Sequence, residues 1–485
     1  MNKAILLLCL AAGLLSCAKE LINPQEENAR NEGVPMQFDI RVSDADATKA
    51  AKTSWAVGDK IYVFFNGLGA KYLTLEYNGS SWLNEAGTLV SNDFEGLGPR
   101  TLTAVHFPVA VDVTFDAGKF SFTSGGKPVY SYYLSETGKD YTVDGITVTA
   151  TLSLTKPADM VQMHVAGIQG NVADYTFGCS KLMPVACASV GTDGVITESA
   201  LQAGARLSGL ADADGGIFAG RLVYPGAEKD YKFTLASDTQ LYTLTRSGRI
   251  LTPGTMYTFP ALSETGGTNW SVQNASELYV DLGIKVGGKT IYWAKCNLGA
   301  DSETDYGDYF AWGEVTGYNE GKTNFASNWS NYLWGTAKNA LTKYCSDAAY
   351  GKDGFTDALS TLLPEDDAAY AALGGKFRMP TDAEIKALRT TIYDTANYTW
   401  TWCDTGVRGW EIKKNSSGAT LFLPAAGYRK DGSLSLDGSS GYYWTSSFET
   451  YSPEYAKGLE FHQFGVSDYY DNRCIGYQVR AVYSE

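Results

Sequence analysis

The chain has 485 residues, a net charge of -15 and 13% aromatic residues. At about 150 residues per domain this length predicts about three domains, and 44% apolar against 19% charged residues indicates a globular protein. The acidic balance argues against nucleic-acid binding, which needs a basic surface to displace counterions. The only histidines are His106, His164 and His462, and their scatter argues against a multi-histidine metal site.

The first twenty residues, MNKAILLLCLAAGLLSCAKE, have the pattern of an export signal. Basic Lys3 precedes the apolar run 4–15, which is too short for a stop-transfer helix. LLSC at 14–17 resembles the lipobox of bacterial lipoproteins, which implies that Cys17 is acylated and becomes the mature N-terminus. The alternative is a plain secretory signal with a chance cysteine. Because acyl chains hold a protein at a membrane, we expect a lipid-anchored, surface-exposed protein of the outer membrane, or a pilus protein.

The chain after the signal peptide (1–17) is expected to start with a polar tether at 18–33 and to continue as β-structure. From residue 34 onwards apolar and polar residues alternate between turns, as in KIYVFF and KYLTLEY. DYKFTLASDTQLYTLTRSG is typical of a hairpin that turns near Ser237-Asp238. Two consecutive β-sandwiches, at 34–150 and 151–262, fit this pattern.

Two motifs in this region resemble the fimbrillin-like proteins of Bacteroidetes. KTSWAVGDKIYVFF at 52–65 resembles their Trp-x-x-Gly-Asp-x-Ile signature, and ILTPGTMYTFP at 250–260 resembles the closing strand of their second domain. The resemblance implies two transthyretin-like sandwiches used as pilus subunits or their relatives. The residues themselves predict that Trp55 anchors a core and that Gly58-Asp59 turns into the strand 61–65.

A polar linker at 263–275 is expected to precede a third domain at 276–485, because nine of the eleven tryptophans lie at or after Trp270. GIKVGGKT at 283–290 matches the phosphate-loop pattern, but a β-rich segment follows it, so we predict a hairpin with a two-residue turn. In FRMPTDAEIKAL, Thr381 and Glu384 form a capping-box pattern at a helix start.

The third domain strongly resembles the Fibrobacter-type major paralogous domain, which has a C-type-lectin-like fold related to formylglycine-generating enzymes. The motifs that carry this resemblance are YVDLGIKVGGKTIYWAKCNLGA, YGDYFAWGE, TWTWCDTGVRGWEIKK, GATLFLPAAGYRKDGSL, GYYWTSSFE and GYQVRAVY. The fold class expected for the whole chain is therefore mainly β: two transthyretin-like sandwiches followed by an α+β C-type-lectin-like domain.

The kinship with formylglycine-generating enzymes raises an enzymatic alternative, which the cysteines disfavour. Those enzymes need a cysteine pair, whereas Cys403 and Cys474 stand alone here, with a structural disulfide between them left open. The pairing of the six mature cysteines (Cys179, Cys187, Cys296, Cys345, Cys403 and Cys474) is not readable from the sequence. The calcium-ligand motifs of C-type lectins are absent, and WTSS stands in their place. No enzyme activity, cofactor or metal is expected.

Candidate ligand-binding residues lie between GYYWTSSFE and GYQVRAVY. Trp444 is predicted to pack in the core, and alternation in KGLEFHQF places Leu459 and Phe461 inside and Glu460 and His462 outside. SDYYDNR at 467–473 is rich in turn formers and is predicted to be a loop. The candidate set is Asp468, Tyr469, Tyr470, Asn472, Arg473 and His462, expected to form a mostly solvent-facing patch for a sugar or protein. The alternative is a loop that only caps the fold.

These features together predict a cell-surface adhesin or pilus-tip subunit whose lectin-like head binds a glycan or protein. By family resemblance, pilus subunits join by strand addition across chains after proteolysis removes a first strand. Arg41 is the candidate cleavage site. The alternative is a free-standing surface lipoprotein that does not polymerise. Expected partners are therefore pilus subunits, a glycan or protein ligand and the membrane, but not nucleic acid.

Overall fold

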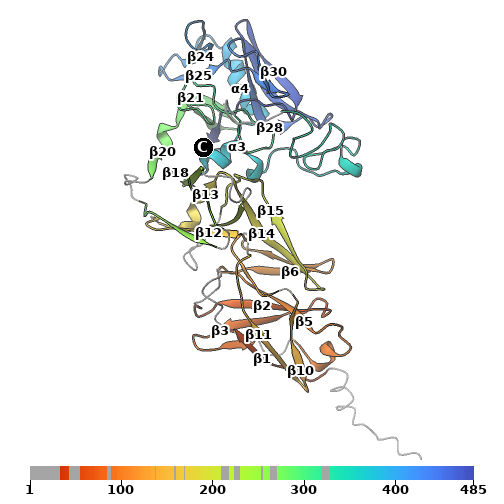
Figure 1. Ribbon diagram of the computed structural model, residues 1–485. Helices are drawn as coiled ribbons and strands as arrows, with labels where there is room; N and C mark the ends of the chain where they lie inside the picture. Colours follow the sequence, from red (N-terminus) through yellow and green to blue (C-terminus); the bar gives the residue numbers. More distant parts are fainter. Residues whose placement is uncertain are drawn as a thin grey trace, which may run out of the picture. The chain divides into compact units, whose positions relative to one another are not determined.

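The computed structural model describes residues 33–485 except 43–54, 85–88, 137, 158–159, 169, 209–217, 223–229, 253–254, 263–269 and 319–326 (Figure 1). The signal peptide, with Cys17, and almost all of the tether lie outside the described residues. The chain forms two compact units: unit 1 contains residues up to Lys156 and Cys187–Thr197, and unit 2 contains Pro157–Ala186 and Glu198–Glu485. The described chain is mainly β, with antiparallel sheets in both units, which confirms the predicted fold class.

Unit 1 contains eleven short strands in its described residues. Their bounds are β1 (Gln37–Val42), β2 (Lys60–Phe65), β3 (Leu73–Tyr77), β4 (Trp82–Asn84), β5 (Thr101–His106), β6 (Asp112–Asp116), β7 (Lys119–Thr123), β8 (Tyr133–Leu134), β9 (Lys139–Asp140), β10 (Thr142–Asp144) and β11 (Thr147–Leu152). One sheet has the order β4-β3-β2-β5-β8, and another has the order β1-β11-β10. Strand β1 pairs with β11 in parallel over six residues.

The core of unit 1 contains apolar residues from both of these sheets. Ile61, Val63 and Val148 are fully buried, and Ile40 of β1 is 8% exposed. Trp55 packs against this core with its ring centroid 4.7 Å from that of Trp82, as the sequence predicted for an anchor. The predicted Gly58-Asp59 turn is also present, because the Ala56 N–H donates to Asp59 Oδ2 at 3.0 Å.

The sandwich strands of unit 2 form two further sheets. Their bounds are β12 (Met160–Val165), β13 (Thr176–Cys179), β14 (Leu182–Gly191), β15 (Ile196–Ala200), β16 (Phe218–Leu222), β17 (Tyr231–Ala236), β18 (Gln240–Arg246), β19 (Met256–Phe259) and β20 (Ser271–Asn274). Neighbouring strands follow the orders β19-β12-β16-β14 and β13-β17-β18-β20. The second half of β14 belongs to unit 1, where Ser189 pairs with Ser121 of β7.

Two segments near these strands test local predictions. Strands β17 and β18 form the predicted hairpin around Ser237-Asp238. The prediction of a linker at 263–275 is wrong for its last residues, because Ser271–Asn274 forms β20 and pairs with β18 over four residues. The residues of SVQN point alternately to the two faces of the sheet, so a segment of polar composition can still form an edge strand through its backbone hydrogen bonds. The division of the chain into three domains remains a prediction.

In its described residues, the C-terminal part of unit 2 combines four small sheets with two short α-helices. Its strands are β21 (Tyr279–Val286), β22 (Lys289–Ala294), β23 (Tyr398–Cys403), β24 (Gly409–Lys414), β25 (Thr420–Pro424), β26 (Tyr428–Lys430), β27 (Ser433–Ser435), β28 (Ser440–Phe448), β29 (Tyr455–His462), β30 (Gly465–Asn472) and β31 (Val482–Ser484). The helices are α3 (Ala368–Leu373) and α4 (Asp382–Thr390). The first and last strands of this part meet, because β22 pairs with both β21 and β31.

Short 3-10 helices occur in the connections. They span Ser91–Phe94, Val172–Asp174, Ala275–Glu277, Lys352–Gly354, Pro364–Asp366 and Thr391–Tyr393. The phosphate-loop match is a hairpin turn as predicted: Gly287 and Gly288, with φ of 58° and 83°, connect β21 to β22. Positive φ at both turn residues is the requirement of a two-residue type I′ turn, which glycine meets without strain.

The C-terminal core encloses the aromatic run that opens β28. Trp444 is fully buried, and its indole N–H donates to the Phe310 carbonyl at 2.9 Å. Tyr443 is 1% exposed and packs with Leu459 and Phe461, both fully buried, in a second apolar cluster. Neighbouring residues of the run thus face opposite sides of the strand, and both sides are interior, which confirms the prediction for Trp444, Leu459 and Phe461.

The predicted capping box begins helix α4. Thr381 Oγ1 accepts from the Glu384 N–H at 3.3 Å, and Glu384 Oε2 accepts from the Thr381 N–H at 2.8 Å. Arg378 donates to both oxygens of the Glu384 carboxylate, at 2.6 and 2.7 Å. Hydrogen bonds from Arg378 and from the Thr381 backbone outweigh burial and lower the pKa of Glu384. Glu384 is therefore a structural carboxylate.

We expect Thr381→Ala to lower the free energy of unfolding by about 1 kcal/mol, because it removes the side-chain acceptor at the helix start. At roughly 2–4 °C per kcal/mol for a domain of ordinary size, thermal unfolding of unit 2 should begin a few degrees earlier. Differential scanning calorimetry measures this shift. Thr395→Ala, at an exposed position shortly after the helix, is the matched control and should leave the transition unchanged.

Candidate functional site

The predicted ligand residues lie in a strand and not in a loop. SDYYDN belongs to β30, which pairs with β29 over eight residues, from Tyr455 opposite Asn472 to His462 opposite Gly465. The loop prediction is therefore wrong. Asp and Asn are turn formers in isolation, but a full ladder of backbone hydrogen bonds outweighs that local preference.

Strand alternation divides the predicted patch between two faces of β30. Asp468, Tyr470 and Asn472 lie on one face, and Tyr469 lies on the other. Tyr470 is 60% exposed, whereas Tyr469 is half-buried with its ring 5.7 Å from that of Tyr442. Asp468 is bound to α4 through an ion pair with Arg389 Nε at 2.8 Å. The residues do not form one continuous surface.

Arg473 contradicts the prediction of a solvent-facing side chain, because it is completely buried. Its guanidinium donates to the carbonyls of Lys343 and Tyr344, at 3.2 and 2.5 Å, and lies 4.8 Å from the ring centroids of both Trp312 and Phe448. Burial lowers its pKa. Arg473 therefore organises the backbone around Tyr344 and is removed from the ligand candidates.

The remaining sequence candidates, His462 and Arg41, are exposed and belong to different units. His462 is exposed at the end of β29, and its Nδ1 accepts from the Phe464 N–H at 3.1 Å. Arg41 lies in β1 of unit 1 with a side chain that is 75% exposed. All six mature cysteines are free thiols, so the disulfide left open between Cys403 and Cys474 is not formed.

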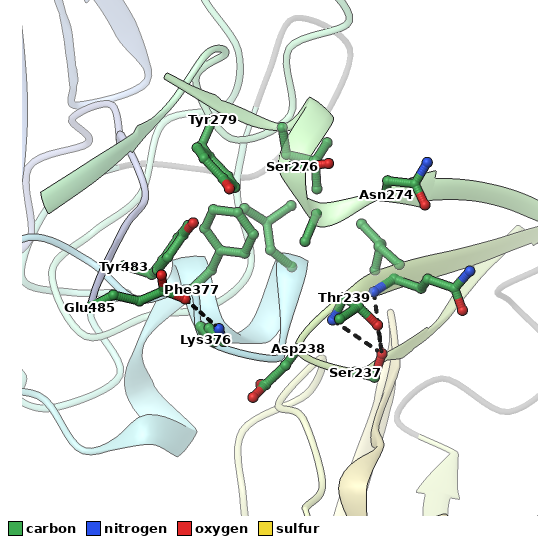
Figure 2. Close-up of a pocket in the computed structure, with 15 residues that line it drawn as sticks. Ser237, Asp238, Thr239, Asn274, Ser276, Tyr279, Lys376, Phe377, Tyr483 and Glu485 are labelled. Atoms are coloured by element: carbon green, nitrogen blue, oxygen red, sulfur yellow. Dashed lines mark hydrogen bonds and ion pairs between the residues drawn. The ribbon is translucent and has the colours of Figure 1, made fainter. Parts of the chain in front are cut away.

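A cavity of about 320 Å³ lies in unit 2, where the β17–β18 turn meets the C-terminal part. We call it the Tyr279 pocket. It is lined by Ser237, Asp238, Thr239, Gln240, Leu241, Asn274, Ala275, Ser276, Leu278, Tyr279, Leu373, Lys376, Phe377, Tyr483 and Glu485. Figure 2 shows Tyr279, Phe377 and Tyr483 gathered on one side, with the hydroxyls of Ser237 and Thr239 across from them.

Aromatic packing fixes the apolar side of the Tyr279 pocket. The Tyr279 ring is edge-on to those of Tyr483 and Tyr292, at 4.8 and 5.0 Å, and the Tyr292 and Tyr483 rings stack at 4.6 Å. Phe377 meets Tyr483 edge-on at 5.6 Å. Phe377 and Tyr483 are each 4% exposed, while Tyr279 is half-buried. Tyr279 is therefore the accessible ring, supported from behind by two others.

The polar rim has an ion pair between Lys376 and Glu485. Lys376 Nζ lies 2.6 Å from Glu485 Oε1, and this hydrogen bond is the main cause of the raised pKa of Lys376; the charge of Asp238 also raises it. Asp238 is exposed at the hairpin turn. The rim therefore contains two carboxylates and one ammonium that is already engaged, together with hydroxyl and carboxamide groups from Ser237–Gln240 and Asn274–Ser276.

At Gly375, the contact between the β17–β18 hairpin and the C-terminal part leaves no room for a side chain. With φ of 54°, a Cβ at Gly375 would lie 2.5 Å from the Ser237 carbonyl oxygen. The hairpin backbone therefore lies directly against the segment that follows α3, and this contact sets the position of Asp238 relative to Lys376.

A buried arginine joins the sandwich strands to helix α3. Arg206 is 3% exposed, and its Nε donates to the carbonyls of Tyr370 and Ala371 at 3.0 and 3.2 Å. Its two terminal nitrogens reach Thr176 O at 3.0 Å and Thr234 Oγ1 at 2.5 Å. Burial lowers its pKa to about 10, which leaves the guanidinium charged at neutral pH. The charge lies at the C-terminal end of α3, where the helix carbonyls favour a cation.

The N-terminal end of α3 is capped from within the C-terminal part. Asp367 Oδ1 accepts from the N–H groups of Ala369, Tyr370 and Met379, at 2.9–3.0 Å. Burial raises the pKa of Asp367 to about 6, and these N–H groups oppose that shift. Both ends of this six-residue helix are thus held by buried charged groups.

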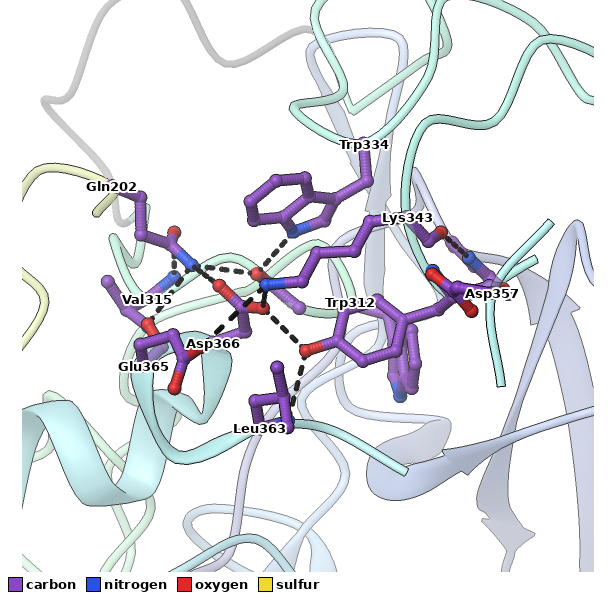
Figure 3. Close-up of polar contacts among 12 residues, drawn as sticks. Gln202, Trp312, Val315, Trp334, Lys343, Asp357, Leu363, Glu365 and Asp366 are labelled. Atoms are coloured by element: carbon purple, nitrogen blue, oxygen red, sulfur yellow. Dashed lines mark hydrogen bonds and ion pairs between the residues drawn. The ribbon is translucent and has the colours of Figure 1, made fainter. Parts of the chain in front are cut away.

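Gln202 makes the second connection between the sandwich and the C-terminal part (Figure 3). Its Nε2 donates to Gly313 O and Asp366 Oδ1, both at 2.9 Å, and its Oε1 accepts from the Val315 N–H at 2.8 Å. The other oxygen of Asp366 binds Lys343 Nζ at 2.6 Å. We call Gln202, Arg206 and their partners the joint. The joint holds the two walls of the Tyr279 pocket in place.

No group of three or more His, Cys, Asp or Glu side chains in the described residues is arranged to hold a metal ion. No helix among them is long and apolar enough to cross a membrane.

Comparison with known proteins found solved structures only. No family model and no curated protein matches the chain. A proposed cell adhesion protein from Bacteroides ovatus is 14% identical, over 50% of this chain and 95% of its own, with a TM-score of 0.25. A fimbrial protein from Bacteroides ovatus is 11% identical, over 93% and 99%, with a TM-score of 0.21. TM-scores this low do not show a close match between the folds.

Sequence reasoning missed the Tyr279 pocket. The turn at Ser237-Asp238 was predicted, and ELYVDLGIKV was assigned to a strand, but no local pattern brings them together with Lys376 and Glu485. The sequence offered one chemical signal for this pocket: Tyr279 closely follows the polar segment Asn-Ala-Ser-Glu at 274–277. Such side chains are common at recognition surfaces.

Proposed function

We propose that this chain is a cell-surface adhesin whose C-type-lectin-like C-terminal part recognises a ligand. The observation that carries the proposal is the Tyr279 pocket, a cavity with a supported aromatic wall and a rim of hydroxyl, carboxamide and carboxylate groups. Pockets of this composition bind small ligands or ligand termini. The acidic net charge suits a protein that faces the medium, and the leader with Cys17 supports display at the surface.

Attachment of whole cells tests the adhesin function. Deleting the gene should reduce binding of the bacteria to host epithelial cells or mucus, and restoring it should recover binding. Surface display is checked in parallel by protease digestion of intact cells. Unchanged attachment by the deletion strain, with the protein confirmed at the surface of the parent, would contradict the proposal.

Two forms of the adhesin remain distinct: a pilus-tip subunit and a free-standing lipoprotein. Cleavage after Arg41 would release most of β1, including Ile40, and β11 would keep only β10 as a neighbour in its sheet. An exposed strand edge of this kind accepts a strand from another chain.

For the tip subunit we expect a mature N-terminus beyond residue 40 and recovery of the protein in pilus fractions. Mass spectrometry of the N-terminal peptide decides between the two forms. An Arg41→Ala strain is the matched test, because it should retain β1 and leave the fibre. If every molecule instead carries a lipid-modified Cys17, the free-standing lipoprotein is the correct form.

A further inference from the structure

We propose that the Tyr279 pocket binds a neutral sugar ring, which stacks on Tyr279 and donates its hydroxyls to the rim carboxylates. This inference rests on the proposed function and names the ligand class of its site. It differs from the sequence-predicted site on β30, and no residue of that set lines the pocket.

The size of the cavity restricts the ligand. At about 320 Å³ it lies at the small end of the range of roughly 300–1,000 Å³ for ligand pockets. One or two sugar rings fit such a space, whereas a folded protein surface does not enter it. A protein partner would have to insert a single side chain, and most of the rim would then remain unused.

The chemistry of the walls matches the two kinds of surface on a pyranose. A sugar ring has an apolar face of C–H groups, which packs on an aromatic ring, and an edge of hydroxyls, which need acceptors and donors. Tyr279 offers the half-buried ring, and its edge-on contacts with Tyr483 and Tyr292 hold it in one orientation. Asp238 lines the same cavity from the β17–β18 turn.

The neighbouring polar groups retain capacity for a ligand. Gln240 Oε1 accepts a hydrogen bond from the Tyr242 hydroxyl, so the amide N–H groups of Gln240 are not used in that bond. Asn274 Nδ2 donates to Glu277 Oε1, which leaves the carbonyl oxygen of the Asn274 side chain as an acceptor. Sites that supply both donors and acceptors recognise hydroxyls and discriminate strongly against analogues that lack them.

Charge favours a neutral ligand over an acidic one. The rim contains two carboxylates, Asp238 and Glu485, and the single ammonium of Lys376 is paired with Glu485 at 2.6 Å. A sialic or uronic acid would bring a third carboxylate and would have to break that ion pair to find a partner. Like charges in close contact are unfavourable, and the chain's charge of -15 adds to the repulsion.

The test is a titration of the purified protein with two panels of probes. The neutral panel contains methyl pyranosides of glucose, galactose and mannose, together with N-acetylglucosamine and N-acetylgalactosamine; the acidic panel contains N-acetylneuraminic and glucuronic acids. We expect saturable binding of at least one neutral probe. Tyr279→Ala should weaken it by about tenfold, and Asp238→Asn by several-fold, which corresponds to the loss of one stacking contact and one charged hydrogen bond.

Matched variants separate stacking from instability. Tyr279→Phe retains the ring and should bind within about twofold of the wild type, while Tyr393→Ala, at a tyrosine of the same unit that is 76% exposed, should have no effect. Lys376→Met removes the ammonium that an acidic ligand would need and is used with the acidic panel. Circular dichroism of each variant checks that the fold is retained.

Each other outcome has a defined meaning. Binding of the acidic panel that Lys376→Met abolishes would overturn the neutral-sugar inference. If no sugar of either panel binds, yet the gene is still required for attachment of cells, the inference is wrong and the adhesin proposal stands. If no sugar binds and deletion of the gene also leaves attachment of the cells unchanged, the proposed function itself is wrong.

Discussion

Replacing Arg206 with Met is expected to lower the melting temperature of unit 2 by roughly 6–12 °C. The substitution keeps most of the side-chain volume but removes all of the donors. The carbonyls of Tyr370 and Ala371 and the hydroxyl of Thr234 would remain buried without that partner. Leaving several buried acceptors unpaired costs about 3 kcal/mol, and each kcal/mol shifts the transition by about 2–4 °C.

Calorimetry with two further variants tests the cause. Arg206→Lys retains a charge but not the forked geometry, so it should fall between wild type and Arg206→Met. Arg249→Met removes an exposed arginine near the end of β18 and should leave the transition in place. If Arg206→Met melts at the wild-type temperature, the joint does not contribute to stability. If Arg249→Met melts equally early, the loss reflects general charge and not the joint.

The joint also links stability to the proposed site. Gly375 follows α3 and contacts the Ser237 carbonyl region, so the helix that Arg206 holds also sets the distance across the Tyr279 pocket. An adhesin experiences force between its anchored end and its ligand. A binding site with one wall on the sandwich hairpin and the other on the C-terminal part would transmit that force through Arg206 and Gln202 as well as through the connecting chain.

The sequence predicted the features that depend on neighbouring residues. Thr381 and Glu384 are three positions apart, and a capping box follows from that spacing alone. Gly287-Gly288 between two alternating runs predicts a hairpin, because only the local backbone is involved. Leu459 and Phe461 were placed in the core by the two-residue period of a strand.

Two failures of sequence reasoning, at Arg473 and Arg206, involve long-range contacts, and a third, at Asp468, involves the neighbouring strand of a hairpin. Arg473 was assigned to the surface because SDYYDNR was predicted to be a loop, but carbonyls about 130 positions earlier in the chain accept its hydrogen bonds inside the protein. Asp468 belongs to a strand because β29 supplies a complete ladder. Arg206 gave no signal at all, since its partners on α3 lie more than 160 residues away.

The second prediction with a large expected effect concerns the membrane anchor. Cys17→Ser should abolish lipid labelling completely and leave an unprocessed precursor that carries its apolar leader. Acylation needs the thiol, and a serine hydroxyl does not replace it as the lipidated group in a lipobox. Because surface retention of a lipoprotein depends on its acyl chains, the variant should also disappear from the outer-membrane fraction.

Cys9→Ser provides a control within the same leader. Cys9 lies in the apolar run, away from LLSC, so this variant should be labelled, processed and displayed like the wild type. Incorporation of an alkyne-modified palmitate, followed by gel fluorescence and fractionation, measures both effects. If Cys17→Ser is still labelled, LLSC is not a lipobox. If it is unlabelled yet secreted with the leader removed, the plain secretory signal is correct, and a fibre or another partner must hold the protein at the cell surface.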